Sequence, residues 1–240
     1  MTAADVSAMT VSAMTAAARA ASAPSPVRGV HILVPGAWYE FDIHPATRDA
    51  AIRDVVRARV QDRPELAEAR TSLVRILGRV AEQAWQAGVV YFGAMAEVDE
   101  DSPLTASLTI MVVEPDEDDQ SRTGGGRPAS LMAALKPVAR GSRPTDPWRR
   151  VRLVELPQAG GAARSEGIDD IELPDDDRTA RMVLMQTFVP FPDGDPRVAV
   201  ISATTSQLAL AEPMLELFDG ITETFRFVRF DEFAAAGEVR

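Results

Sequence analysis

Cysteine is absent from this 240-residue chain, and Lys136 is the only lysine among its 25 basic residues. The lack of cysteine excludes a disulfide framework, a thiolate nucleophile and a cysteine-ligated metal site. Because arginine replaces lysine almost throughout and alanine is abundant, the composition is typical of a GC-rich genome. A single arginine in this sequence is therefore weak evidence for a functional site.

Positive charge is also scarce, since the formal net charge is −11. A nonspecific nucleic-acid-binding protein needs a basic surface, and so does a protein that adheres to anionic membranes. No stretch approaches the roughly 20 consecutive apolar residues that span a bilayer. The N-terminus opens with Asp5 rather than the basic cluster of a secretory signal. We therefore expect a cytoplasmic protein with neither a nucleic-acid nor a membrane partner.

The common catalytic motifs are missing as well. The sequence contains no G-x-S-x-G and no H-E-x-x-H. The two histidines, His31 and His44, lie at the beginning of a predicted strand and just before a predicted helix, where histidine is more often structural than catalytic. The three glycines at 124–126 lack the lysine and Ser or Thr of a phosphate-binding loop. The sequence predicts a non-enzymatic protein without a cofactor.

Acidic runs at 116–119 and 175–177 are the remaining candidates for a metal site. Calcium is bound by several oxygen atoms that converge from alternate positions, as in an EF-hand. The acidic residues of both runs are adjacent in the sequence and do not alternate with other residues. Asp193-Gly194-Asp195 is typical of a turn. Solvated loops are the better interpretation. We therefore predict that the chain has no metal site.

Residues 64–88 form the stretch around which the chain is organised. Pro64 suits the first turn of a helix and Gly88 suits its C-terminal cap. Between them, apolar residues recur at steps of three and four, which predicts an amphipathic helix: Leu66, Ala69, Leu73, Ile76, Leu77, Val80, Ala84 and Trp85. We expect Leu73, Ile76, Leu77 and Val80 to point into the sheet and Arg79 to be solvated.

The strands follow from alternation and turn residues. Residues 89–98 and 104–113 form a hairpin about a polar connector, and 181–189 with 198–205 form a second hairpin. Residues 148–156 read as a strand with Trp148, Val151 and Leu153 buried, and Arg150 and Arg152 in solvent. Helices are predicted at 45–60 and 208–225. This order predicts an α+β fold in which helices pack on an antiparallel sheet.

The composition of the sequence divides the chain into two tails and one domain. Residues 1–28 are low in complexity and contain Val-Ser-Ala-Met-Thr twice, so they are predicted to be a disordered tail. A misassigned start codon is the alternative explanation of this segment. Residues 29–232 are predicted to form a single α+β domain, and residues 233–240 a C-terminal tail.

The element order and the ending Leu-Phe-Asp-Gly-Ile-Thr-Glu-Thr-Phe-Arg-Phe at 217–227 resemble the Mog1/PsbP-like α+β sandwich. Small actinobacterial lipoproteins of the LpqN type are similar too. The resemblance covers residues 30–230, and the additional N-terminal helix departs from the family pattern. It implies a non-enzymatic binding or assembly factor.

Trp38, Tyr39 and Trp148 are the candidate partner-binding residues. They lie in predicted strands with an exposed face, and Trp and Tyr dominate the energetics of many protein interfaces. Ordinary core packing is the alternative role for these side chains.

Two functions are compatible with these observations. The first hypothesis is a cytoplasmic protein that binds another protein through its sheet face or helix pair. Accessory or chaperone-like work in an actinobacterial secretion or envelope system would follow from the resemblance. The alternative is a small-ligand carrier or enzyme with a pocket between sheet and helices. A pocket with convergent polar groups would favour the carrier or enzyme, and an apolar patch rimmed by charge the binding protein.

Overall fold

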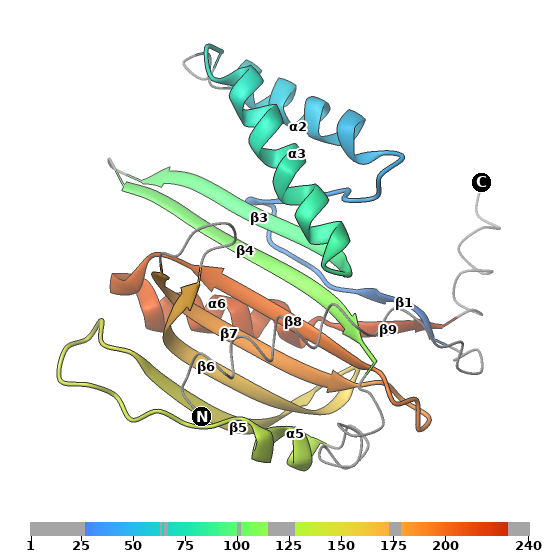
Figure 1. Cartoon of the computed structure of the whole chain (residues 1–240), viewed down its shortest axis with the longest axis vertical. Coiled ribbons are helices and arrows are strands. Elements are labelled where there is room, and N and C mark those ends of the chain that lie inside the picture. The colour runs from blue at the N-terminus through green and yellow to red at the C-terminus, as the bar shows by residue number, and fades with distance from the viewer. Residues whose placement is uncertain are drawn as a thin grey trace.

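The computed structural model describes residues 27–62, 64, 67–99, 102–114, 128–172 and 179–229. It confirms the predicted α+β fold. Seven strands form an antiparallel sheet in the order β2-β3-β4-β8-β7-β6-β5, and β1 pairs with β9 in a second, two-stranded sheet (Figure 1). The predicted tails lie outside the described residues, except for Val27 and Arg28, which belong to β1.

The elements of the fold have the following bounds. The strands are β1 (Val27–His31), β2 (Trp38–Phe41), β3 (Val89–Asp99), β4 (Ser102–Val113), β5 (Trp148–Leu156), β6 (Gly160–Glu172), β7 (Thr179–Pro190), β8 (Val198–Thr205) and β9 (Arg226–Arg229). The helices are α2 (Arg48–Asp62), α3 (Arg70–Gln86), α5 (Pro128–Ala134) and α6 (Ala211–Glu223), the last preceded by a 3-10 turn, η2 (Leu208–Leu210).

The two faces of the large sheet are covered differently. Because side chains alternate along a strand, β3 places Met95 in the core shared with α6 and Phe92 in a smaller core under α2 and α3. Helix α6 and the β1–β9 sheet cover the first face. On the opposite face, α2 packs on β2 and α3 on β3, while α5 packs over β5 and β6 at the far end (Figure 1).

The main core lies between the sheet and α6. Phe218 and Phe225 are fully buried there, and Val183 and Met185 of β7 point toward them from alternate positions of the strand. Phe227 lies on β9 opposite Val30 of β1, and both side chains pack against this core. The first and last described strands thus pair with each other and pack on the face of the sheet that α6 covers.

The prediction for α3 is half right. Leu73 and Leu77 pack against the smaller core, and Arg79 is exposed, as expected. The prediction was wrong for Ile76 and Val80, whose residues are 51% and 36% exposed. The helix rests on β3 near one edge of the sheet, and among the described helices only α2 lies beside it. Its buried strip is therefore narrower than its apolar stripe.

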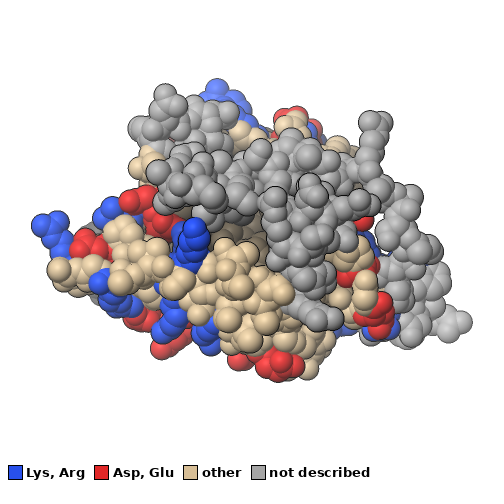
Figure 2. All heavy atoms as spheres, turned by 60° about the horizontal axis from the view of Figure 1, so that its bottom comes forward, with Lys and Arg blue, Asp and Glu red and all other residues tan. Residues whose placement is uncertain are grey.

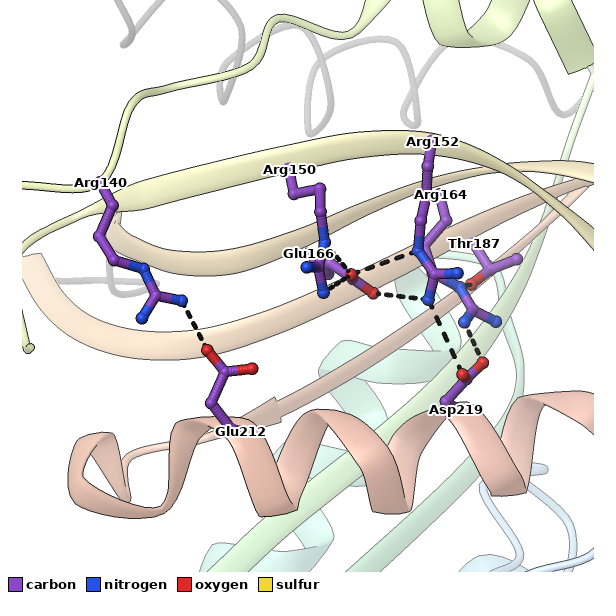
Figure 3. A network of polar contacts seen from close by, with 8 residues as sticks. All are labelled: Arg140, Arg150, Arg152, Arg164, Glu166, Thr187, Glu212 and Asp219. Carbon is purple, nitrogen blue, oxygen red and sulfur yellow. Dashed lines mark hydrogen bonds and ion pairs between the residues drawn. The ribbon is translucent and has the colours of Figure 1, made fainter.

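The prediction for β5 was right for Trp148, which is buried, and for Arg150, which is exposed, but wrong for Leu153, which is 51% exposed. Arg150 and Arg152 lie on the face toward α6 (Figure 3), and Leu153 lies on the other face. Side chains of a strand alternate between its two faces. Because Trp148 and Leu156 are buried toward α6, the other even-numbered side chains of β5 also point toward α6. The arginines tolerate this inward face because β5 is an edge strand, where their guanidinium groups reach both acidic partners and solvent.

Val27 marks where the domain begins, because its side chain is buried and its backbone pairs with Arg229. We expect a chain beginning at Val27 to keep the melting temperature of the full chain, since residues 1–26 carry little apolar surface to bury. A chain beginning at Val30 is the matched control. It loses the Val27 contact and should melt about 5 °C lower. Thermal denaturation distinguishes the two, and an equal loss in both chains would contradict the assigned boundary.

Candidate functional site

One flank of α3 exposes apolar side chains. Ile76 and Val80 are one turn apart, and Ala87, just beyond the helix end, falls on the same side at about 100° per residue. The opposite flank faces α2: Glu82 lies 3.7 Å from the Arg48 guanidinium, and the Trp85 ring lies 5.0 Å from that of His44. We call Ile76, Val80 and Ala87 the α3 stripe. Since α2 lies over β2 and α3 over β3, the stripe faces the side of β4.

The sheet surface beyond the stripe is rich in hydroxyl groups. Ser107 of β4 and Thr204 of β8 hydrogen bond at 2.9 Å, and the Gln186 amide of β7 donates to Ser202 at 3.4 Å. All four side chains are half-buried and lie on the face of α2 and α3. Among the described helices, only α5 at the far end shares this face with α2 and α3 (Figure 1). The α3 stripe therefore lies beside the half-buried polar side chains of these strands.

A second group of functional residues lies on the other face, between the sheet and α6. Figure 3 shows charged side chains that extend from β5 and β6 toward the helix. Arg164 of β6 is fully buried. Its Nε donates to the Thr187 hydroxyl at 3.0 Å, and one of its terminal nitrogens binds the Asp219 carboxylate of α6. This pair connects the centre of the sheet to the helix.

Glu166 is the buried carboxylate of the same network. Arg150 donates to it through Nε at 2.7 Å, and Arg152 donates to it through two nitrogens at 3.3 Å each. Arg152 also lies 3.7 Å from Asp219 and so links the two acids. The three arginines of this group, with Glu166 and Asp219, are called the arginine cluster below.

A third ion pair continues the line toward the beginning of α6. Arg140 donates to Glu212 at 2.6 Å, and its guanidinium also lies 4.2 Å from the centre of the Trp148 ring (Figure 3). Glu212 and Asp219 are two helical turns apart and so lie on one side of α6. The helix is therefore held along its length by charged groups of the sheet and of the segment before β5.

The charges of the arginine cluster do not balance. Among the described residues, three guanidinium groups face two carboxylates, which leaves the cluster one surplus positive charge in a chain whose net charge is −11. Within the described residues, the second terminal nitrogen of Arg164 is buried and has no hydrogen-bond acceptor. A buried donor without an acceptor costs about 1–3 kcal/mol. The cluster therefore has both the charge and the donor to hold one anionic group.

The predicted partner-binding residues are not brought together. Trp38 and Trp148 are buried, and they lie on β2 and β5, the opposite edges of the sheet. Tyr39 is half-buried, with the Arg59 guanidinium 5.1 Å from its ring centre. Two of the three side chains thus offer little surface to a partner. Their binding role stays a prediction that now depends mainly on Tyr39.

The histidines and acidic residues show structural contacts. His44 accepts a hydrogen bond from the Ala46 amide at 3.3 Å, and His31 has a buried ring nitrogen without an acceptor or donor among the described residues. Asp195 binds Arg197, and Asp193 lies 3.2 Å from Arg229. In the described ranges, no three metal-binding side chains converge. The acidic runs at 116–119 and 175–177, and the glycines at 124–126, lie outside those ranges.

Sequence reasoning missed the arginine cluster, although a signal for it exists. Arg150 and Arg152 share the parity of buried Trp148, and Arg164 and Glu166 share that of buried Ile168. Charged residues at core-facing positions of two adjacent strands indicate a buried polar network. The alternation of Arg150 and Arg152 with Val151 and Leu153 instead favours a solvated face for the arginines.

No family model matches the sequence, and no curated protein matches it significantly. The resemblance to the Mog1/PsbP-like sandwich therefore stays a prediction. In the part of the chain that the structure describes, no helix is both long and apolar enough to cross a membrane.

Proposed function

We propose that the chain is a non-enzymatic binding protein that takes up a segment of another protein beside the α3 stripe. The observation that carries the proposal is the exposure of Ile76 and Val80, one turn apart on the same flank of α3, while Leu73 and Leu77 of this helix are packed. These two residues belong to the eight exposed large hydrophobic residues in the described ranges. Neighbouring apolar side chains on a surface are typical of interaction sites.

The chemistry of the α3 stripe and of the strands beside it suggests an amphipathic helix as the partner segment. The stripe offers an apolar surface of about three helical turns, and Ile76 and Val80 have the spacing that i and i+4 anchors of a bound helix contact. The sheet surface beside the stripe offers the hydroxyls of Ser107 and Thr204 and the amide of Gln186. A helix with an apolar edge and a polar underside complements both surfaces. It would extend the two-helix layer of α2 and α3 across β4 and β8.

The cellular setting proposed with this function is accessory or chaperone-like work in the cytoplasm. The link to an actinobacterial secretion or envelope system is supported by the family resemblance, through the ending at 217–227. Cell fractionation of the native host with an antibody to the chain tests the location.

Replacing Ile76 and Val80 together by serine should abolish partner capture and leave the fold intact, because both side chains are largely exposed. The melting temperature should change by less than about 2 °C. The measurement is site-specific crosslinking in the native host, with a photoreactive residue at Val80 and mass spectrometry of the products. We expect one crosslinked protein with the parent chain, and its loss when Ile76→Ser is added.

The matched control is a photoreactive residue at Leu153, which is equally apolar and exposed but lies on β5. It should not crosslink the same protein. If the two positions capture the same set of proteins, or if Ile76→Ser leaves the crosslink at Val80 unchanged, the proposed surface is wrong.

A further inference from the structure

The geometry points to a binding site for a single carboxylate group in the arginine cluster. This inference is independent of the proposed partner surface, since the cluster lies on the opposite face of the sheet, under α6 (Figure 3). The site consists of Arg152 and Arg164, with Asp219 beside them and Glu166 behind.

Charge sets the capacity of the site. Glu166 and Asp219 neutralise two of the three guanidinium groups of the cluster, and Arg140 is occupied by Glu212. One further negative charge would make the cluster neutral. A carboxylate carries one charge, whereas a phosphate monoester carries nearly two at neutral pH. The surplus therefore matches a carboxylate.

The unused donor sets the position of the ligand. Arg164 uses Nε for Thr187 and one terminal nitrogen for Asp219, and its second terminal nitrogen has no acceptor in the part of the chain that the structure describes. A guanidinium group presents parallel donors that match the two oxygens of a carboxylate. A carboxylate that accepts from this nitrogen and from Arg152 would satisfy the buried donor.

Entry to the site lies past Arg152 and Asp219. The side chain of Arg164 is only 1% exposed, whereas those of Arg152 and Asp219 are 41% and 37% exposed. A ligand would therefore approach Arg164 from the side of these two exposed side chains. The Arg152 guanidinium can turn toward a bound carboxylate, because its contact to Asp219 is long at 3.7 Å. The ligand is thus a free small carboxylate or the carboxylate of an extended peptide terminus.

The test is a titration of the full chain with acetate at constant ionic strength, with chloride as the balancing anion and thermal denaturation as the readout. We expect a saturable rise in melting temperature, as for any ligand that binds the native state. Arg152→Gln, at an exposed position, should weaken the apparent affinity by about tenfold or more, since a charge-assisted hydrogen bond is lost. Arg164→Met should remove the effect. Arg181→Gln is the control, because Arg181 forms a charge-balanced pair with Asp170 on the surface.

Two further arms identify the class and the source of the carboxylate. Inorganic phosphate should shift the melting temperature less than acetate, and a short peptide with a free terminal carboxylate should bind where its amidated form does not. The inference is overturned if acetate gives no saturable shift, if Arg152→Gln and Arg181→Gln respond alike, or if phosphate binds more tightly than acetate.

Discussion

Replacing Asp219 by alanine is expected to lower the free energy of unfolding by about 3–5 kcal/mol, which is a large part of the roughly 5–15 kcal/mol of a typical domain. Asp219 is the only carboxylate that binds Arg164 within the described residues, and Arg164 is fully buried. Its removal leaves a guanidinium charge in the core with Thr187 as its remaining partner. Urea denaturation of the parent and the variant measures the difference.

The opposite change in the same pair should be far milder. Arg164→Met removes the buried charge and leaves Asp219, which is partly exposed and can be solvated. We expect a cost below about 1.5 kcal/mol, and the double variant Arg164→Met with Asp219→Ala should recover most of the stability lost in Asp219→Ala.

The surface pair Asp170–Arg181 is the matched control for this series. The hydrogen bonds from Arg181 hold the pKa of Asp170 below its usual value, yet both side chains are exposed. Asp170→Ala should therefore cost less than about 1 kcal/mol. Equal losses of stability in Arg164→Met and Asp219→Ala would contradict this explanation. They would mean that the ion pair itself stabilises the fold, and that the burial of Arg164 relative to Asp219 does not determine the cost of each substitution.

Gly167→Ala should be the most destructive small change in the sheet, with a loss of at least about 3 kcal/mol or no folded protein at all. Gly167 of β6 has φ +154°, and a Cβ atom there would lie 2.0 Å from the Trp148 carbonyl oxygen. The clash is with backbone, so rotation of a side chain cannot relieve it. Either β5 moves away from β6, or the strands lose the register that places Arg150 and Arg152 under α6.

Gly78→Ala provides the comparison for that substitution. Gly78 lies inside α3, and nothing approaches within 4 Å of the position that its Cβ would occupy. Alanine there should raise stability by up to about 1 kcal/mol, because glycine is a poor helix former. The two variants differ only in where one methyl group is added. Equal effects on the midpoint of urea denaturation would show that the β5–β6 contact is looser than described.

The sequence pattern was most informative where one face of an element is buried and the other is wet. The hairpin of β7 and β8 was predicted within two residues at each end, because Val183 and Met185 alternate with half-buried positions. The α3 prediction failed in part because periodicity identifies an apolar face but not how much of it is covered. Ile76 and Val80 belong to the apolar stripe of the helix, and the neighbours that decide their exposure come from other elements.

The candidate sites were harder to predict than the fold. Arg164 and Glu166 lie two residues apart, whereas Thr187 and Asp219 come from distant segments that meet only when α6 covers β6 and β7. No local rule links these positions. The aromatic candidates had the reverse problem, since Trp38 and Trp148 are chemically suited to an interface but are used in the core.

The pairing of β1 with β9 has a consequence for synthesis of the chain. Among the described strands, the ribosome makes β1 first and its partner β9 last, so Val27 has no strand to pair with until Arg229 has been made. Contacts between distant segments form slowly because the intervening chain must first be ordered. Strands β3 to β8 can assemble earlier through their hairpins, and β1 must wait in the nascent polypeptide. The two-stranded sheet therefore forms only after β9 has been synthesised.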